Sequence, residues 1–89
     1  MPRYHFHVTD SRDYPDLQGT LLDDVQAARI EAVRFSGRLL EKAADTFWDG
    51  EEWHMRVTDE ADLTLFTLLF VGTDGASLNP GAKSRNLKP

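Results

Sequence analysis

Hydrophobic and polar positions alternate at the start of the chain. In residues 3–8 the aromatic and β-branched residues share one face, and the polar residues share the other. A period of two with such residues predicts a half-buried strand. A polar loop with turn residues follows over residues 10–19, and residues 20–22 predict a short second strand that returns beside the first.

The longest periodic stretch predicts one amphipathic helix. Apolar residues from Val25 to Phe47 fall within one arc of a helical wheel, while charged residues occupy the opposite face. Asp23, followed three residues later by Gln26, fits a capping box at the helix start. We expect Gly50 to end the helix as a C′ residue in the left-handed conformation.

The second half of the chain predicts a β-hairpin. Residues 52–58 alternate, residues 59–62 form the turn, and residues 63–71 form the last strand. This last strand is apolar on both faces, which is typical of a strand that is buried on both sides. Because a single helix covers only one face of a sheet, the second apolar face needs another cover.

Together these elements predict an α+β fold in the order β-β-α-β-β, with one amphipathic helix on one face of an antiparallel sheet. We expect a single domain over residues 1–71 and a mobile or loosely packed C-terminal tail over residues 72–89. The predicted core consists of Tyr4, Phe6, Val8, Val25, Ala28, Ala32, Phe35, Leu39, Trp53, Met55, Val57, Phe66, Leu68 and Phe70.

Composition and charge narrow the possible functions. A chain of 89 residues holds one hydrophobic core, and the absence of cysteine excludes disulfides and thiolate chemistry. The net charge is −5, and the acidic residues lie almost entirely before residue 72, which argues against a nucleic-acid partner. No stretch approaches the roughly 20 apolar residues that cross a bilayer, so we expect no membrane partner and a cytoplasmic location.

Three histidines are the candidates for metal chemistry. His5 and His7 share the outward face of one predicted strand, and His54 lies on the outward face of another. Two imidazoles at this spacing, with a third from a neighbouring strand, could bind a metal, although ordinary surface histidines are the alternative interpretation. No serine sits in a strand-to-helix elbow, so we predict no catalytic residue, no enzyme activity and no cofactor.

The second face of the last strand is the candidate interaction surface. It carries Leu63, Leu65, Leu69 and Val71, which would form an exposed apolar patch. We expect a second copy, in a homodimer, or another protein to cover this patch, with Leu65→Glu making the protein monomeric or insoluble. The alternative is that the C-terminal tail folds back over it.

A set of short motifs accompanies these patterns: Met1-Pro2-Arg3-Tyr4, Phe6-His7-Val8, Pro15-Asp16, Gly19, Leu22-Asp23, Ala27-Ala28, Glu31-Ala32 and Val57-Thr58-Asp59-Glu60. Together they resemble the short bacterial proteins of the family named domain of unknown function 6894. The resemblance spans roughly residues 1–71 and its opening and Ala-Ala/Glu-Ala helix carry it. It implies a stand-alone, cytoplasmic bacterial protein, and no activity is established for the family.

Residues 14–19 and the capped helix after them are also similar to the N-terminal domain of HicB-type antitoxins. That similarity implies, as an alternative, a protein that neutralises a small toxin. The chain departs from this pattern because Gly19 and Asp23 lie closer together, and no DNA-binding segment follows. We therefore predict a non-catalytic module for protein interaction or self-association, with the antitoxin and metal-binding functions as alternatives.

Overall fold

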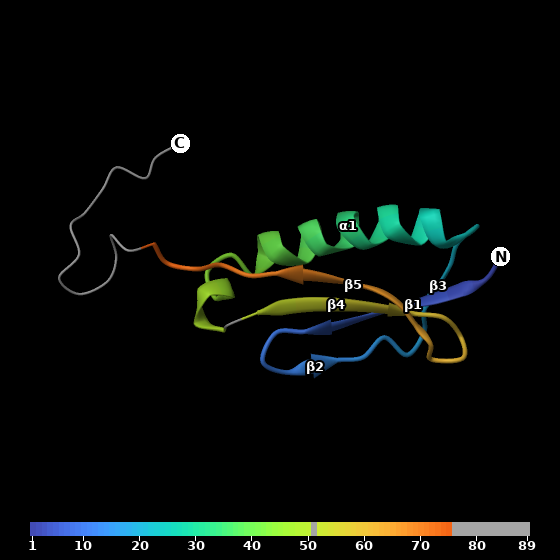
Figure 1. The fold of residues 1–89 in the computed structure, drawn as a ribbon, viewed down its shortest axis with the longest axis horizontal. Helices are drawn as coiled ribbons and strands as arrows, with labels where there is room; N and C mark the ends of the chain where they lie inside the picture. Colours follow the sequence, from blue (N-terminus) through green and yellow to red (C-terminus); the bar gives the residue numbers. More distant parts are fainter. Residues whose placement is uncertain (51, 76–89) are drawn as a thin grey trace.

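A computed structural model describes residues 1–50 and 52–75 of the protein. Helix α1 lies on one face of an antiparallel sheet, which confirms the predicted α+β fold with one further short strand (Figure 1). From residue 76 on, the predicted tail lies outside the described residues. The elements in chain order are β1 (Arg3–Thr9), β2 (Asp13–Tyr14), β3 (Thr20–Leu21), α1 (Val25–Lys42), the 3-10 helix η1 (Phe47–Asp49), β4 (Trp53–Thr58) and β5 (Thr64–Phe70).

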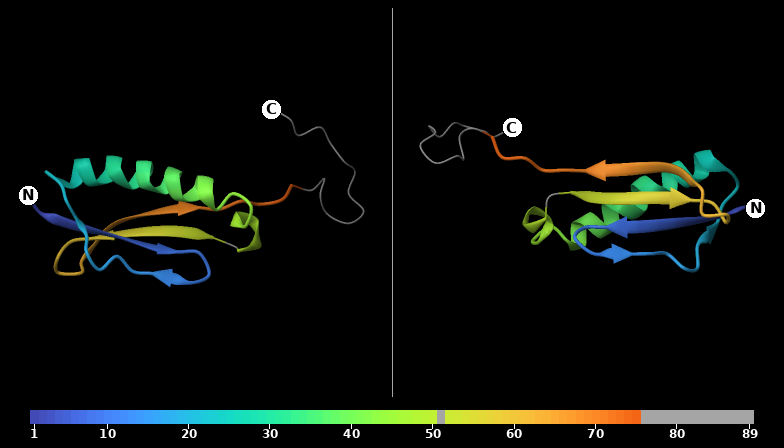
Figure 2. Two further views of the ribbon diagram at one scale, coloured as in Figure 1. Left: turned by 180° about the vertical axis from the view of Figure 1, so that it is seen from behind. Right: turned by 60° about the horizontal axis from the view of Figure 1, so that its bottom comes forward.

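The sheet has the strand order β2-β1-β4-β5, and β3 pairs with the other end of β1. All pairings are antiparallel. The right-hand view of Figure 2 shows these strands side by side, with α1 crossing behind them. The central strands β1 and β4 carry alternating aromatic and aliphatic residues, so one face of the sheet is apolar and meets the helix.

Strand β2 was not predicted, because its two residues lie in what the sequence shows as a polar loop. Asp13 pairs with Thr9 and Tyr14 pairs with Val8. Both β2 residues are exposed, so no hydrophobic alternation marks them. Backbone pairing with β1 alone defines this strand.

The helix boundaries differ from those predicted. Asp24 caps the helix, and its carboxylate accepts the Ala27 N–H over 2.8 Å, so the capping box predicted from Asp23 is wrong. The helix ends at Lys42, before a turn and η1, and not at Gly50. Gly50 has a φ of −102°, which is not left-handed. The apolar pattern continues past the helix end because Phe47 packs against the core from η1.

The buried core was all predicted, and it consists of Tyr4, Phe6, Ala28, Ala32, Trp53, Met55 and Val57. The other predicted core residues except Val25 are partly buried and pack against this cluster. The prediction for Val25 is wrong, because it is the first residue of α1 and leaves 37% of its surface exposed. Val25 thus belongs to the apolar arc of the helical wheel but lies at the surface.

Small residues bring the helix close to the sheet. Ala28, Ala32 and Ser36 are fully buried on one stripe of α1, and the Ser36 hydroxyl lies 3.5 Å from the sulfur of Met55 in β4. A helix is about 10 Å wide and neighbouring strands lie about 4.8 Å apart, so one helix covers about two strands. The β1–β2 side of the same sheet face is therefore left partly open.

The hairpin of β4 and β5 contains an irregularity at its closed end. Val57 pairs with Phe66 but Thr58 pairs with Thr64, so Leu65 is an extra residue without a partner. Thr58 falls on the polar side of the alternation in residues 52–58, yet it is 1% exposed. Leu63 lies before β5 and not within it.

Candidate interaction surfaces

The two histidines of β1 bind the loop beside them. Their rings stack with centroids 6.1 Å apart. His5 Nδ1 lies 2.9 Å from the Asp16 carbonyl oxygen, and the Asp16 N–H points at His7 Nδ1 over 3.1 Å. A carbonyl only accepts and an amide N–H only donates, so His5 donates from Nδ1 while His7 accepts there. His7 Nε2 then donates to the Thr58 hydroxyl over 3.0 Å.

These contacts favour an uncharged His7. Burial lowers the pKa of His7 below its ordinary value of 6.5, and the positive charges of Arg56 and His5 lower it further. The carboxylates of Asp16 and Asp62 act in the opposite direction without reversing the shift. A proton on Nδ1 would also face the Asp16 N–H, so protonation breaks this hydrogen bond.

The three histidines predicted as possible metal ligands do not converge. His54 bonds the Glu52 carboxylate over 2.8 Å, and it faces Thr9 in the pairing of β1 with β4, whereas His7 faces Arg56. Both ring nitrogens of His7 already have protein partners. Within residues 1–50 and 52–75, no group of three or more His, Asp or Glu side chains could hold a metal ion. The geometry gives the metal-binding alternative no support.

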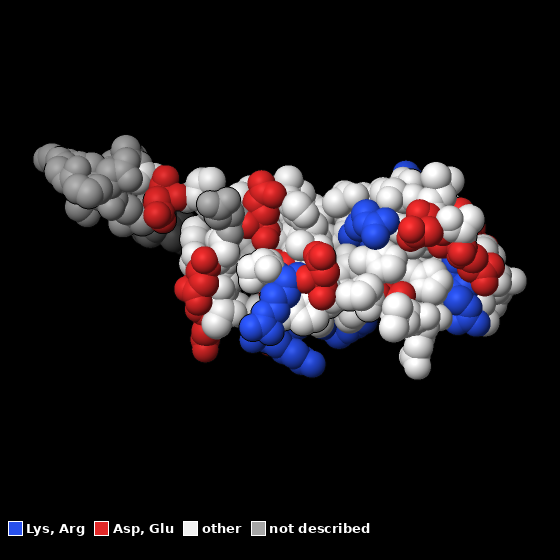
Figure 3. Space-filling view, turned by 90° about the horizontal axis from the view of Figure 1, so that it is seen from below, with Lys and Arg blue, Asp and Glu red and all other residues white. Residues whose placement is uncertain are grey.

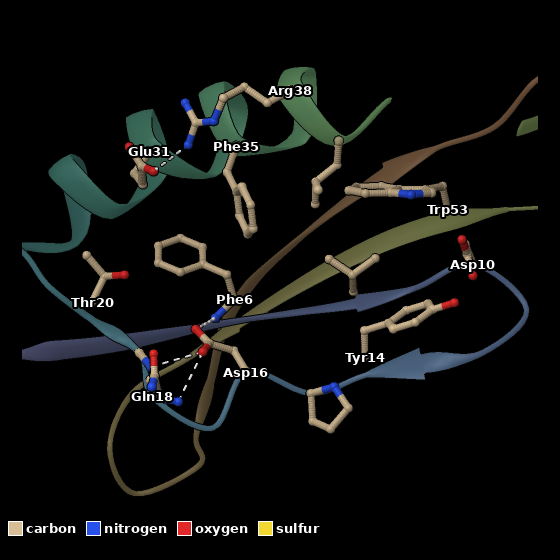
Figure 4. Close-up of a pocket in the computed structure, with 14 residues that line it drawn as sticks. Phe6, Asp10, Tyr14, Asp16, Gln18, Thr20, Glu31, Phe35, Arg38 and Trp53 are labelled. Carbon is tan, nitrogen blue, oxygen red and sulfur yellow. Dashed lines mark hydrogen bonds and ion pairs between the residues drawn. The ribbon is translucent and has the colours of Figure 1, made fainter. Parts of the chain in front are cut away.

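Asp16 completes the sheet between β2 and β3. Its carboxylate accepts the backbone N–H of Phe6 over 3.0 Å. On this side of β1 Phe6 lies between the residues paired with β2 and those paired with β3, so no strand carbonyl faces its N–H. The same carboxylate accepts the N–H groups of Gln18 and Gly19 (Figure 4). Burial alone would raise the pKa of Asp16, but these three hydrogen bonds outweigh it and lower the pKa below its ordinary value. The Pro15-Asp16 and Gly19 motif is thus structural.

A groove lies between α1 and the β1–β2 side of the sheet (Figure 4). Its volume is about 670 Å³, within the range of ligand and peptide sites. Phe6 and Phe35 meet edge to face with ring centroids 6.3 Å apart and form its centre. The remaining apolar wall consists of Val8, Tyr14, Pro15, Leu39 and Trp53.

The rim of this groove is mainly acidic. Asp10, Asp16 and Glu31 line it together with one cation, Arg38. The Arg38 guanidinium lies 3.1 Å from Glu31 and 5.6 Å from the centre of the Phe35 ring, so it is already paired. Sequence reasoning missed the groove because its walls come from separate segments, and no local pattern brings them together.

The predicted apolar patch is only partly exposed. Leu63, Leu69 and Val71 each leave more than half of their surface to solvent, but Leu65 is half-buried and packs against the core. Leu65 is the extra residue of the bulge, which explains why it leaves the face that strict alternation assigns to it. The exposed patch therefore consists of Leu63, Leu69 and Val71, without Leu65.

The outer strand β5 offers unpaired backbone groups. The backbone N–H of Phe6 points away from β4, toward Asp16. Phe6 pairs with Val57 of β4, so the backbone N–H and C=O of Val57 point away from β1 and toward β5. Val57 in turn pairs with Phe66. By alternation, the backbone groups of Thr67 and Leu69 point to the free edge of the sheet, and no described strand pairs with them.

Side chains of α1 lie beside this edge, on the face of the sheet that the helix covers. The Arg29 guanidinium lies over the Phe66 ring of β5, with 5.7 Å to the ring centroid. Val33 follows Arg29 by one turn on the same flank and is 59% exposed. The edge of β5 thus has an exposed apolar side chain on each face of the sheet: Val33 on the face that carries α1 and Leu69 on the opposite face.

The sheet face away from α1 is mostly polar, with Leu69 exposed at its β5 edge. Figure 3 views the protein from this side and shows basic and acidic side chains interspersed. Arg56 lies here within 3.9 Å of Asp62 and bonds the Thr64 hydroxyl. In the part of the chain that the structure describes, this face carries no continuous basic surface. No helix in that part has the length and apolar character that a membrane crossing needs.

Comparison with known proteins gives a family and no activity. Residues 3–71 match the family described as domain of unknown function (DUF6894). Searches of curated proteins and of solved structures found no match. Nothing in these comparisons supports the similarity to HicB-type antitoxins. The family match covers both histidines of β1, the Asp16 loop, α1 and the whole β4–β5 hairpin, and the chain belongs to the DUF6894 family.

Proposed function

We propose that this protein is a non-catalytic self-association module, in which two copies pair through the free edge of β5. The observation that supports it most is the orientation of Thr67 and Leu69, whose backbone groups point out of the sheet without a partner in the described residues. An antiparallel edge is self-complementary under a twofold axis, because each N–H of one copy meets a C=O of the other.

The part of the edge from Phe66 to Phe70 lacks the usual protection against pairing. Exposed edge strands of natural proteins are commonly blocked by lysine, proline or a bulge. From Leu63 to Val71 this chain has no charged residue and no proline. The bulge lies at the start of β5, so the ladder from Phe66 to Phe70 is regular. The two β5 strands would therefore meet without repulsion between like charges.

Apolar groups on both sides of the edge support a second copy as the partner. Val33 lies on the helix side, while Leu69 lies in β5 and Val71 directly after it. A twofold axis perpendicular to β5 would bring these apolar groups toward those of the partner and remove them from water. Contiguous exposed apolar surface of this kind usually marks a contact.

The test is the mass of the purified protein in solution, measured by light scattering after gel filtration. We expect the mass of two chains. Leu69→Lys places two like charges across the proposed axis and should give the mass of one chain. Leu17→Lys makes the same chemical change at a loop leucine that is 86% exposed, and it should remain a dimer.

Amide hydrogen exchange provides a second measurement that does not depend on a variant. In a dimer the N–H groups of Thr67 and Leu69 are bonded to the partner and should exchange slowly. In a single chain they face water. A monomeric mass over a wide concentration range, together with fast exchange at both amides, would contradict the proposal. Circular dichroism of each variant checks that the fold is retained.

A further inference from the structure

We propose that the C-terminal segment of this chain, residues 76–89, docks in the groove between α1 and the β1–β2 side of its own sheet. This inference goes beyond the proposed self-association, which uses the opposite edge of the sheet. Three observations support it: the shape of the groove, its charge and the point where the chain leaves the sheet.

The groove has the character of a peptide site. Phe6, Phe35 and Trp53 provide an aromatic wall, and a volume of about 670 Å³ accommodates several side chains. Aromatic-lined grooves with a few polar groups are a common way to bind extended, proline-containing peptides. Residues 76–89 carry Leu78 and Leu87 as apolar groups and Pro80 between them.

Charge complementarity favours this segment as the occupant. Lys83, Arg85 and Lys88 are its charged residues, and it contains no Asp or Glu. The groove rim presents the carboxylates of Asp10 and Asp16, whereas the one rim cation, Arg38, is paired with Glu31. A basic segment thus meets an acidic rim, and the attraction should weaken as salt increases.

The segment starts near enough to reach the groove. The last residue of β5, Phe70, pairs with Trp53, and their rings lie 5.5 Å apart. Trp53 also lines the groove, so the chain leaves the sheet beside one end of it. Up to Gly75 the described chain runs past the end of the sheet (Figure 1). Residues 76–89 reach about 45 Å when extended, which is ample.

A tethered segment needs only weak affinity. Because it is joined to the domain, its effective concentration at the groove is on the order of millimolar. A docked segment would cover the exposed parts of Phe35 and Leu39.

Paramagnetic relaxation in the full chain tests the proposal. The sequence contains no cysteine, so Asn86→Cys creates a single site for a nitroxide label. We expect the amide signals of Tyr14, Phe35 and Leu39 to lose most of their intensity. The amide signals of Glu60 and Ala61, in the turn at the opposite end of β4 from Trp53, should keep most of theirs.

Matched variants and a mixed sample make the outcome decisive. Asp10→Lys reverses a rim charge and should restore much of the lost signal, while Asp45→Lys, an exposed residue outside the groove, should not. Uniform broadening, or broadening centred on Leu69, would overturn the proposal. So would broadening of the Tyr14 and Phe35 signals in unlabelled, isotope-enriched chains mixed with labelled ones, because the segment would then dock in the groove of another copy.

Discussion

Asp16 donates its backbone N–H to Nδ1 of His7 over 3.1 Å, and this hydrogen bond exists only while that nitrogen carries no proton. The stacked neighbour His5 binds the carbonyl of the same residue. From the sequence these two histidines are candidate metal ligands, but in the structure they bind the loop between β2 and β3 to the central strand β1.

The first prediction concerns pH. The pKa of His7 is lowered by burial and by Arg56, so the unfolded chain binds more protons than the folded one just below pH 6.5. The contribution of His7 to stability is present above pH 6.5 and is lost as the pH falls toward its folded pKa. Urea unfolding at several pH values should show the loss, with a smaller slope in His7→Gln. An unchanged slope in that variant would contradict this role.

The second prediction concerns the carboxylate of Asp16. Asp16→Ala leaves the Phe6 N–H without its acceptor and should lower the free energy of unfolding by about 1.5–3 kcal/mol. Asp13→Ala is the matched control. Its carboxylate accepts an exposed Thr9 hydroxyl, so its loss should cost at most about 1 kcal/mol. Equal effects of the two substitutions would show that the Asp16 hydrogen bonds are not special.

The stabilisation by the Asp16 carboxylate should depend on pH, because its pKa is lowered in the folded protein. Because the folded pKa lies below the ordinary value of 3.8, the stabilisation is present above pH 3.8 and is lost as the pH falls through the folded pKa. Acid unfolding of the wild-type protein should therefore include this step, and Asp16→Ala should lack it. Denaturation curves between pH 5 and pH 2 measure the difference.

The third prediction compares two glycines. Gly19 has a φ of +73°, and an added Cβ would lie 2.9 Å from the Tyr4 carbonyl oxygen. Gly19→Ala should cost about 1–3 kcal/mol of unfolding free energy. Gly37 lies inside α1 with no atom within 4 Å of such a Cβ, so Gly37→Ala should add about 0.5–1 kcal/mol. Thermal unfolding should shift in opposite directions, and a shared sign would refute the comparison.

The fourth prediction concerns the close approach of α1 to the sheet. Ala32 is fully buried under the helix, so Ala32→Leu should push the helix away and cost about 1–3 kcal/mol. Ala44→Leu adds the same atoms at an exposed position after the helix and should change stability by no more than about 0.5 kcal/mol. Chemical denaturation separates the two; a stable Ala32→Leu variant would mean that the interface has spare room.

The sequence alone determined which residues form the main strands, where the helix lies and which side chains are buried. These features depend on the period of apolar residues, which is a local property of the chain. Every buried core residue, from Tyr4 to Val57, was predicted in this way. The errors at Asp23 and Gly50 are boundary errors, because two adjacent aspartates compete for the cap and η1 continues the apolar pattern.

Only the tertiary structure decided the surfaces. Strand β2 exists through backbone pairing with β1, and Leu65 turns inward because the hairpin bulges beside Thr58. The groove combines side chains from β1, α1, β4 and the Asp16 loop. Contacts between distant segments depend on register and on how far a single helix reaches across a sheet. Residue periodicity carries no information about either, so the surfaces open to a partner appear only once the chain is folded.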